Sequence, residues 1–501
     1  MRRSVVALIV FALAALVPIA LPARPAHAAV ADAPHCSTSG TWRQGELNIY
    51  WFDVEQGDSQ LIVGPTGRTL LIDLGENNYA RTGTATNAYR VAGAIRAICG
   101  IASGPVHLDY VMASHHHLDH FGYGAVPGDT TKYGQGLYQL LTPTGSGGLG
   151  FTVGQLIDHD GGTWTDANGD GKCEPGTSTT PSGEIHYDNA GTTSTTAARW
   201  ICWLYGPAGQ ADRANIDGKV LRLVNSNPWP SLDLGTGVSA NILEANAKDV
   251  KEADGVTPVS GDHTTDPTPP SENDYSIALR VSFGPYVDAT AGDSDGEYST
   301  SANGYSYNDI ESLLAPKMGQ VNSLRVNHHG SAHSSSQGYI NTLDPQQAFI
   351  SCGVNSYGHP GNRVLDALRS VGADIYLAND PCDDVDTTGA PIDYSGTYNH
   401  NGDVHLATSG GGAGFDVTYD AGTRSYTTRP DGSGTSSAAA QVKVNEFLMA
   451  PSSGGTEWVE LYNPTNTAAD VGGLYIDDVA AGGGAPGRSR PGRPSPRTVA
   501  G

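Results

Sequence analysis

The amino-acid sequence predicts an α/β (α+β) fold in which sheets and helices are stacked in layers, followed by a small β-rich segment. Two observations predict the layers: short apolar runs alternate with helical stretches, and turns rich in glycine separate them. The chain has 65 glycines and only 16% charged residues, which is typical of a loop-rich protein with many strands. Its length of 501 residues indicates two or three structural units.

The N-terminal residues have the pattern of a secretory signal peptide. Two arginines precede a nearly unbroken apolar run over residues 5–21, and Ala26-His27-Ala28 is a small-x-small cleavage site. We therefore expect residues 1–28 to be removed and the mature protein to be secreted. A membrane anchor is the alternative, but the run is short for a bilayer span and contains a proline.

Strands and one helix are predicted in the N-terminal half. The apolar runs at residues 47–54, 60–63 and 69–73 predict three strands, the last two joined by a Pro-Thr-Gly turn. A helix around residues 88–99 and a strand over residues 108–113 follow.

Further along, residues 160–200 and 250–272 are rich in Gly, Thr, Ser, Asp and Pro and predict long surface loops. Regular structure then resumes and ends in a hairpin. The predicted strands are 276–281, 286–289, 323–326, 348–352, 403–407 and 415–419, and the predicted helices are 308–314 and 362–371.

The composition changes after the last predicted hairpin. Residues 427–441 form a Gly/Ser/Thr/Ala linker, residues 442–480 contain two β-rich runs, and residues 481–501 are rich in Gly, Pro and Arg and predict a disordered tail. The layered domain is therefore expected at residues 44–425.

Charge and cysteine content also restrict the class of protein. The formal net charge of −24 repels nucleic acid and anionic membranes at long range, but it permits a local metal-neutralised cleft. Six cysteines in an exported chain favour three disulfides, for which fifteen pairings are possible. We favour the sequential pairing Cys36–Cys99, Cys173–Cys202 and Cys352–Cys382.

Residues 115–120 read His-His-His-Leu-Asp-His and match the pattern H-x-H-x-D-H. Its fixed positions are His115, His117, Asp119 and His120, which cannot easily bind one ion together but can serve two ions side by side. They follow a predicted strand, so they lie on a loop where a rigid scaffold presents them to solvent. An adventitious His-rich surface stretch is the alternative, and it predicts no complementary ligands elsewhere.

Complementary ligands do occur, each just beyond a predicted strand. Asp73, Asp293, the pair His328 and His329, and His359 all have this placement. Any one of them alone would be an ordinary loop residue, but their shared placement predicts a single site.

In this order, the blocks resemble the metallo-β-lactamase fold and, within it, the extracellular nuclease-like domain of ComEC-type competence proteins. The resemblance covers about residues 44–420 and implies a four-layer αβ/βα sandwich with two metal ions between the sheets at one edge. The blocks are D-V-E-Q-G-D at 53–58, L-I-D-L-G at 71–75, the hexapeptide at 115–120, Gly-Asp at 292–293, H-H-G-S at 328–331 and Y-G-H-P at 357–360.

The resemblance also implies a ligand set, position by position. Mixed imidazole and carboxylate ligands suit Zn²⁺ best, with Mn or Fe as alternatives. Asp73 and Asp58 are expected behind the ligands, with Asp73 orienting one of the histidines. The implied ligands are His115, His117 and His328 or His329 for one ion, Asp119, His120 and His359 for the other, and Asp293 as the bridge.

Two departures from the family pattern affect this assignment. Glu55 replaces a glycine of the first block, and the lone histidine that the superfamily has between the hexapeptide and the bridging Asp is not evident. His159 is a candidate for that position. We prefer the pair at 328 and 329, because ComEC-type sequences keep it, and within the pair we favour His328.

Paired ions about 3.5–4 Å apart clamp a phosphoryl or acyl centre and generate hydroxide near neutral pH. Asp119 and Asp293 would then act by holding the ions, a bridging hydroxide would be the nucleophile, and His329, if not a ligand, would protonate the leaving group. The leading hypothesis is thus a secreted dinuclear phosphodiesterase or nuclease, a monomer whose substrate is a phosphodiester such as DNA.

Other functions stay open at this stage. On the same scaffold, a phosphorylcholine esterase, phospholipase, lactonase or β-lactamase would use the same ligands. A non-enzymatic protein associated with the cell surface is a further alternative, in which the C-terminal segment is the working part.

Two further motifs remain. Asp166, Asn168 and Asp170 match the start of a calcium loop, with Glu174 as a substitute for the closing Glu that is absent at Thr177; a plain Asx/Gly turn is the alternative that we favour. Residues 442–480 resemble the first half of a lamin-tail domain, an immunoglobulin-like β-sandwich, through V-N-E at 444–446 and E-W-V-E-L-Y-N-P at 457–464.

Overall fold

The computed structural model describes residues 32–429, with gaps at 77, 79–80, 125–133, 177–182, 208, 297–300, 303, 379–381 and 399–401. Beyond residue 429 it describes only the short strands β22 (Lys443–Leu448), β23 (Trp458–Tyr462), β24 (Tyr475–Ile476) and β25 (Gly487–Arg488). The expected signal peptide and most of the expected linker and tail lie outside the described residues.

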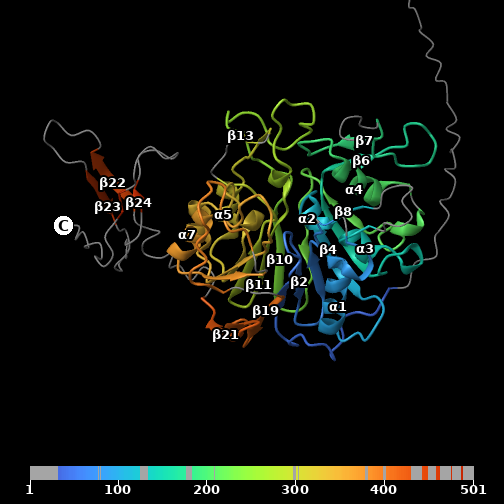
Figure 1. Cartoon of the computed structure of the whole chain (residues 1–501), viewed down its shortest axis with the longest axis horizontal. Coiled ribbons are helices and arrows are strands. Elements are labelled where there is room, and N and C mark those ends of the chain that lie inside the picture. The colour runs from blue at the N-terminus through green and yellow to red at the C-terminus, as the bar shows by residue number, and fades with distance from the viewer. Residues whose placement is uncertain are drawn as a thin grey trace, which may run out of the picture. The chain divides into compact units, whose positions relative to one another are not determined.

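A nine-stranded mixed sheet contains most of the N-terminal half (Figure 1). An antiparallel meander of three strands leads into four strands that run parallel to one another. In spatial order the strands are β21 (Gly422–Thr427), β20 (Gly414–Tyr419), β19 (Val404–Ser409), β1 (Asn48–Trp51), β2 (Gln60–Val63), β3 (Thr69–Ile72), β4 (His107–Ala113), β5 (Thr152–His159) and β8 (Val220–Leu223).

An eight-stranded mixed sheet contains the second half. Five of its strands, from β12 to β18 in spatial order, run parallel, so their C-terminal ends meet at one edge. In spatial order the strands are β18 (Thr397–Tyr398), β17 (Asp374–Leu377), β16 (Gln347–Ile350), β15 (Ser323–Arg325), β12 (Tyr286–Thr290), β11 (Ala278–Phe283), β10 (Val238–Glu244) and β9 (Ser231–Leu232).

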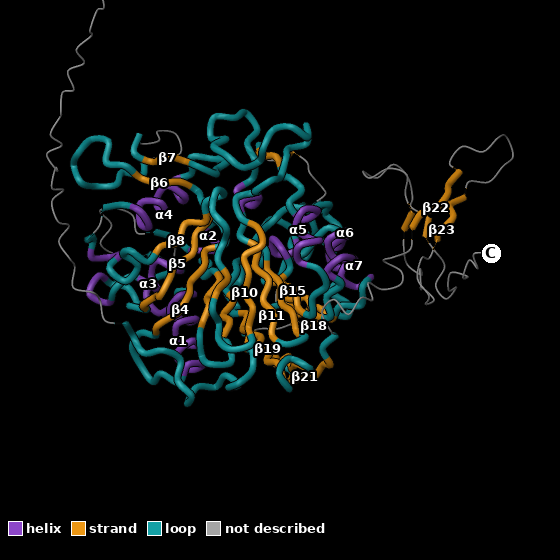
Figure 2. The backbone as a smooth tube through the Cα atoms, turned by 180° about the vertical axis from the view of Figure 1, so that it is seen from behind, coloured by secondary structure: helices purple, strands orange, loops and turns teal. Residues whose placement is uncertain are grey.

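The three largest apolar clusters of the described residues lie one between the sheets and one on the outer face of each. Leu71 packs toward the outer helices and its neighbour Ile72 packs between the sheets, because successive strand residues face opposite sides. The helices lie outside the sheets on both sides (Figures 1 and 2). They are α1 (Asn87–Cys99), α3 (Leu137–Leu141) and α4 (Thr195–Tyr205) on the nine-stranded sheet, and α5 (Glu311–Met318), α6 (Gln337–Leu343) and α7 (Asn362–Ser370) on the other.

The disulfide prediction is confirmed. Cys36 pairs with Cys99, Cys173 with Cys202 and Cys352 with Cys382. Three disulfides are typical of an extracellular or otherwise oxidising environment. Within the described part of the chain, no helix is both long enough and apolar enough to cross a bilayer.

The expectation of loops over residues 160–200 is wrong in part. The short strands β6 (Gly162–Trp164) and β7 (Ile185–Tyr187) pair there, and α4 begins at Thr195. Ser194 caps α4, because its hydroxyl accepts a hydrogen bond from the Ala197 backbone N–H. The residues just before this cap are rich in Ser and Thr, so composition alone predicts a loop and misses the helical spacing of the apolar residues that follow.

The packed region extends slightly beyond the expected limits of 44 and 425. Trp42 is buried, and at the other end β21 continues to Thr427. Arg429 forms an ion pair of 2.9 Å with Asp344. Farther on, β22 and β23 pair antiparallel, and the rest of the expected lamin-tail segment lies largely outside the described residues.

A buried carboxyl group in β12 predicts a pH-dependent stability. Burial raises the pKa of Asp288 to about 7, although Ser323 and Gln60 donate hydrogen bonds to it. Because the folded protein holds this proton more tightly than the unfolded chain, the stabilisation is complete below about pH 4 and is lost as the pH rises through 7.

We expect Asp288→Asn to remove this dependence. Between pH 4 and 8 the free energy of unfolding of the unsubstituted protein should fall relative to that of the variant, by up to about 4 kcal/mol. Urea unfolding of both proteins across this range measures the difference, and a difference that does not change with pH would contradict the assignment.

Candidate metal centre

The predicted ligands gather where the C-terminal ends of parallel strands meet. Asp73 follows β3 and the hexapeptide follows β4 in one sheet. Asp293 follows β12 in the other, the pair at 328 and 329 follows β15, and His359 lies beyond β16. The two sheets face each other across the apolar region between them, so loops far apart in sequence meet at this edge.

Two glycines of the first blocks hold the hexapeptide in place. Asp119 and His120 lie in the short helix α2 (Leu118–Phe121), which begins directly after His117. A Cβ atom at Gly75 would lie 1.8 Å from the Asp119 carbonyl oxygen, and one at Gly57 would lie 2.7 Å from it. Only a residue without a side chain permits this approach, which explains the two glycines at 57 and 75.

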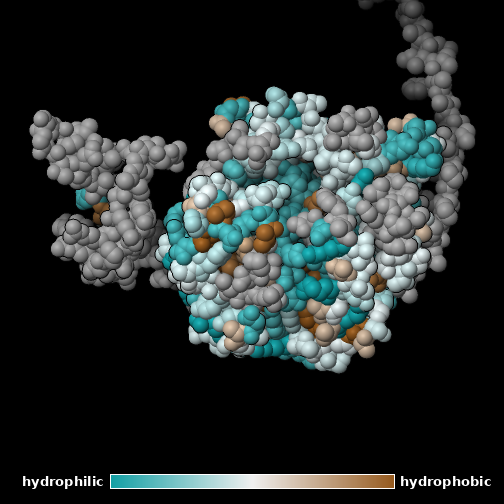
Figure 3. Space-filling view, in the orientation of Figure 1, coloured by the Kyte–Doolittle hydropathy of each residue, from teal (hydrophilic) through white to brown (hydrophobic). Residues whose placement is uncertain are grey.

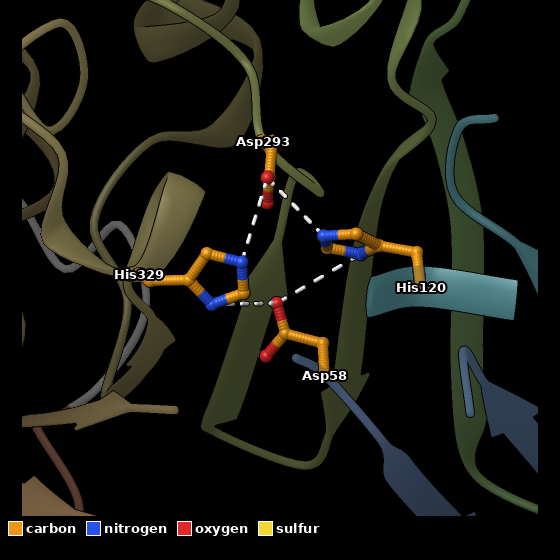
Figure 4. Close-up of side chains that lie close together, drawn as sticks. All are labelled: Asp58, His120, Asp293 and His329. Carbon is orange, nitrogen blue, oxygen red and sulfur yellow. Dashed lines mark ion pairs between the residues drawn. The ribbon is translucent and has the colours of Figure 1, made fainter. Parts of the chain in front are cut away.

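Asp293 is the centre of the group. Its Oδ2 lies 3.1 Å from His120 Nε2, 3.6 Å from His329 Nε2, 3.8 Å from His115 Nε2 and 3.9 Å from His328 Nε2. Figure 4 shows Asp293 and Asp58 on opposite sides of the imidazoles of His120 and His329. One carboxylate oxygen among four imidazole nitrogens is the arrangement expected of a bridging ligand.

One subset of ligand atoms lies on the His115 side. His115 Nε2 and His117 Nδ1 face each other at 3.0 Å, and His328 approaches Asp293 from the other sheet. His328 also contacts Asn273, whose Nδ2 lies 3.2 Å from Nδ1 of the ring. Ring nitrogens converging at this distance suit a shared cation.

The second subset contains Asp119, His120 and His329. His329 Nε2 lies 3.4 Å from Asp119 Oδ2, while its Nδ1 donates to the Ser351 carbonyl at 3.0 Å. His120 Nδ1 lies 3.0 Å from Asp73 Oδ2. In both rings the Nδ1 contact leaves the Nε2 lone pair for a ligand, as in carboxylate–histidine–metal triads.

Buried polar atoms without a hydrogen-bond partner test whether Asp293 and its neighbouring histidines fit a metal ion. Among the described residues, His120 Nε2, His329 Nε2 and Asp293 Oδ1 are buried without a hydrogen-bond partner. Buried polar atoms rarely lack partners, and these belong to residue types that bind Zn²⁺. The residues therefore fit a metal ion.

The structure brings both His328 and His329 to Asp293, where only one of them was expected as a ligand. His359 lies farther out, with its ring centroid 5.3 Å from that of His328 and 6.2 Å from that of His329. It is 5% exposed and its Nδ1 is buried without a hydrogen-bond partner among the described residues.

Arg325 is a site residue that the sequence reasoning missed. Its buried guanidinium forms an ion pair with Asp58 and lies 3.7 Å from carboxylate oxygens of both Asp73 and Asp293. Asp58 Oδ2 lies 3.6 Å from His329 Nδ1, so the pair lies directly behind the ligands. The sequence does contain a signal for this role, because Arg325 is a charged residue in the predicted strand 323–326, three positions before His328.

The buried groups shift one another's pKa. Burial lowers the pKa of His120, but the carboxylates of Asp293 and Asp73 outweigh it and raise the pKa well above its usual value. Burial and the nearby His120 hold the pKa of His115 well below its usual value. Burial opposes ionisation of Asp293, but the surrounding histidines lower its pKa well below the usual range. Asp293 is thus ionised and His115 neutral, as metal ligands must be, whereas a bound cation would have to displace the proton that the carboxylates favour on His120.

His159 does not join the ligands around Asp293. Its Nε2 lies 3.0 Å from Glu272 Oε1, and Glu272 also accepts from the His116 backbone N–H at 3.0 Å. The His116 side chain contacts Asp158 at 3.0 Å. His116, His159 and Glu272 thus form a second group, separate from the ligands around Asp293. His116 belongs to the hexapeptide, at a position where the pattern H-x-H-x-D-H allows any residue.

A cavity of about 790 Å³ opens onto these ligands. Hydroxyl, amide and tyrosine side chains line it, and no lysine or arginine is among its described lining residues. The lining includes Gln56, Thr192, Ser194, Thr196, Ser271, Asn273, Tyr305, Tyr307, Ser331, Asn355 and Tyr357.

Comparisons with known proteins give only remote likenesses, all of them to solved structures. No family model matches the chain, and no curated protein matches it. Among solved structures, it is similar to a crystal structure described as a metal-dependent hydrolase of the β-lactamase superfamily, at 11% sequence identity and a TM-score of 0.30. That similarity covers 66% of this chain and 95% of the other.

The geometry predicts the metal content. We expect the purified protein to retain about two transition-metal ions per chain after dialysis, because mixed imidazole and carboxylate ligands bind them tightly. Asp293→Ala should lose at least one of them, since Asp293 contacts both subsets.

Elemental analysis by mass spectrometry measures this difference. Asp366→Ala is the matched control, because the Asp366 side chain is 75% exposed on α7. Full metal content in the Asp293 variant would contradict the bridging role.

Proposed function

We propose that this protein is a secreted hydrolase of the metallo-β-lactamase fold that uses two metal ions to cleave a phosphodiester. The observation that carries the proposal is the position of Asp293 Oδ2 among the nitrogens of four histidines, at 3.1–3.9 Å. The two facing sheets with helices outside, and the order of the sequence blocks, support the αβ/βα sandwich of that fold.

The proposed ligands divide into two sets that share Asp293. His115, His117 and His328 would hold one ion, and Asp119, His120 and His329 the other, with His359 beside both His328 and His329. Zn²⁺ is the proposed metal, and Mn or Fe are the alternatives. When bound, the pair supplies Lewis acidity and lowers the pKa of a water molecule to near neutrality.

Residues behind the ligands position them. Asp73 and the Ser351 carbonyl orient the rings of His120 and His329. Arg325 balances the negative charge of the buried carboxylates, which would otherwise repel one another.

Glu311 positions the loop that carries His328 and His329. Its carboxylate accepts hydrogen bonds from Asn327 Nδ2 at 2.8 Å and from the backbone N–H groups of Ser335 at 2.6 Å and Ser336 at 2.8 Å. Because Glu311 is fully buried, these bonds fix the loop at both of its ends.

The cavity suits a phosphodiester with few charges. Hydroxyl and amide groups such as those of Ser331 and Asn355 suit phosphate oxygens. Tyr357 is 61% exposed beside His359 and presents a ring face on which a nucleobase can stack. Without lysine or arginine in the described lining, a short or single-stranded substrate is favoured over duplex DNA.

The remaining parts of the proposal concern location and assembly. The signal-peptide pattern and three disulfides support secretion. On the face displayed in Figure 3, apolar residues form small separate patches, which supports a monomer.

Four substrates distinguish cleavage of a nucleic-acid phosphodiester from the other reactions of this fold. We expect the Zn²⁺-loaded protein to hydrolyse bis-p-nitrophenyl phosphate and single-stranded DNA, and to be weak on a phosphorylcholine ester and on a β-lactam. Asp293→Ala should lower kcat/KM by about a thousandfold or more, and Asp366→Ala should leave it unchanged. Activity confined to the β-lactam would overturn the substrate class, and activity confined to the choline ester would exclude a nucleic-acid substrate. An active Asp293 variant would overturn the two-metal mechanism.

A further inference from the structure

We propose a calcium site, separate from the metal centre, in the segment between β6 and β7, with Asp166, Asn168, Asp170 and Glu184 as its side-chain ligands. The proposal is independent of the proposed function. It replaces the plain turn that we favoured from the sequence.

The loop itself has the form of either a turn or a cation site. Asp166 accepts hydrogen bonds from the backbone N–H groups of Gly169 at 2.7 Å and Gly171 at 3.0 Å. Asn168 Oδ1 accepts from Asp170 N–H at 2.9 Å. These bonds turn the side-chain oxygens toward one another, but an Asx turn would form the same bonds without a ligand.

Glu184 is the observation that a turn does not explain. It comes from outside the loop and is only 4% exposed. Its Oε2 accepts from Trp164 Nε1 at 3.2 Å and from the Glu174 backbone N–H at 3.0 Å. Its Oε1 is buried with no hydrogen-bond partner among the described residues.

The unpaired oxygen of the Glu184 carboxylate indicates a bound cation. One ligand atom each from Asp166, Asp170 and Glu184 lie within 4.8 Å of one another. Three carboxylates this close repel one another, and burying Glu184 with one oxygen unpaired is costly unless a cation compensates. Lys172 Nζ lies 3.7 Å from Asp170 Oδ2, but its side chain is 74% exposed.

The ligand chemistry selects Ca²⁺. Every candidate ligand atom is an oxygen, and Ca²⁺ takes six to eight oxygens in a flexible geometry. The only cysteine of the loop, Cys173, is in a disulfide, so no thiolate is available for Zn²⁺. Glu174, the closing ligand expected from the sequence, instead lies with its Oε2 3.4 Å from Asn168 Nδ2.

Such an ion would fasten one wall of the substrate cavity. Glu184 directly precedes β7, and the chain then continues to Thr192, Ser194 and Thr196, which line the cavity. The disulfide Cys173–Cys202 ties the other end of the loop to α4. We therefore expect Ca²⁺ to protect residues 160–190 from proteolysis.

Terbium luminescence tests the site directly, because Tb³⁺ replaces Ca²⁺ and is excited through a nearby tryptophan. The full-length protein, stripped with EGTA and resupplied with Zn²⁺, is titrated with Tb³⁺ under tryptophan excitation. Since Trp164 contacts a proposed ligand, we expect saturable emission that excess Ca²⁺ abolishes and the same concentration of Mg²⁺ does not.

Variants separate this site from the metal centre. Glu184→Gln and Asp170→Asn should each weaken Tb³⁺ and Ca²⁺ binding by about tenfold or more. Asp170→Asn tests the site even if Glu184→Gln prevents folding, because Asp170 lies at the surface and its substitution should not disturb the core. Trp164→Phe should abolish the emission but keep the heat of Ca²⁺ binding, and Asp293→Ala should keep both.

Three results would overturn the proposal. They are absence of sensitised emission in the unsubstituted protein, an unchanged affinity in Asp170→Asn, and loss of the emission in Asp293→Ala, which would place the terbium in the metal centre.

Discussion

The burial of Asp293 is the constraint on which the site depends. A carboxylate that is 2% exposed is stable only if positive charge or hydrogen bonds compensate it. Four histidines and the guanidinium of Arg325 surround it. Arg325 in turn pairs with Asp58, so the first sequence block is joined through charge to the strand β15 that precedes the fifth block.

The backbone around this group is held in conformations that side chains normally avoid. Asp73, His328 and His329 have φ values of 59°, 51° and 53°, in the left-handed region that favours glycine. Such conformations persist only where the surroundings impose them. Here the buried Glu311 holds the loop of the two histidines, and Asp73 accepts from the Ser114 backbone N–H at 2.7 Å. The fold thus stores local strain that directs the two histidines toward Asp293 and Asp73 toward His120.

The charge distribution of the molecule is consistent with a small substrate. The chain carries a net charge of −24, and the described cavity lining contains no lysine or arginine. A long polyanion would meet repulsion over most of the surface. Metal ions at the cavity floor would then be the main source of positive charge, so binding and reaction would depend on the same ions.

By itself, the sequence determined the hexapeptide and its strand and most strands that lead to ligands, because these depend on local periodicity and spacing. The disulfide pairing was the favoured choice among fifteen, and the structure confirms it. It did not predict α4 or the role of Arg325. It also left His328 and His329 unresolved and did not single out Glu184. The roles of Arg325, His328 and His329 depend on contacts between residues far apart in the chain, such as Arg325 with Asp58 and His329 with Asp119. Only the packing of the two sheets brings these residues together, and periodicity within one segment carries no information about that packing.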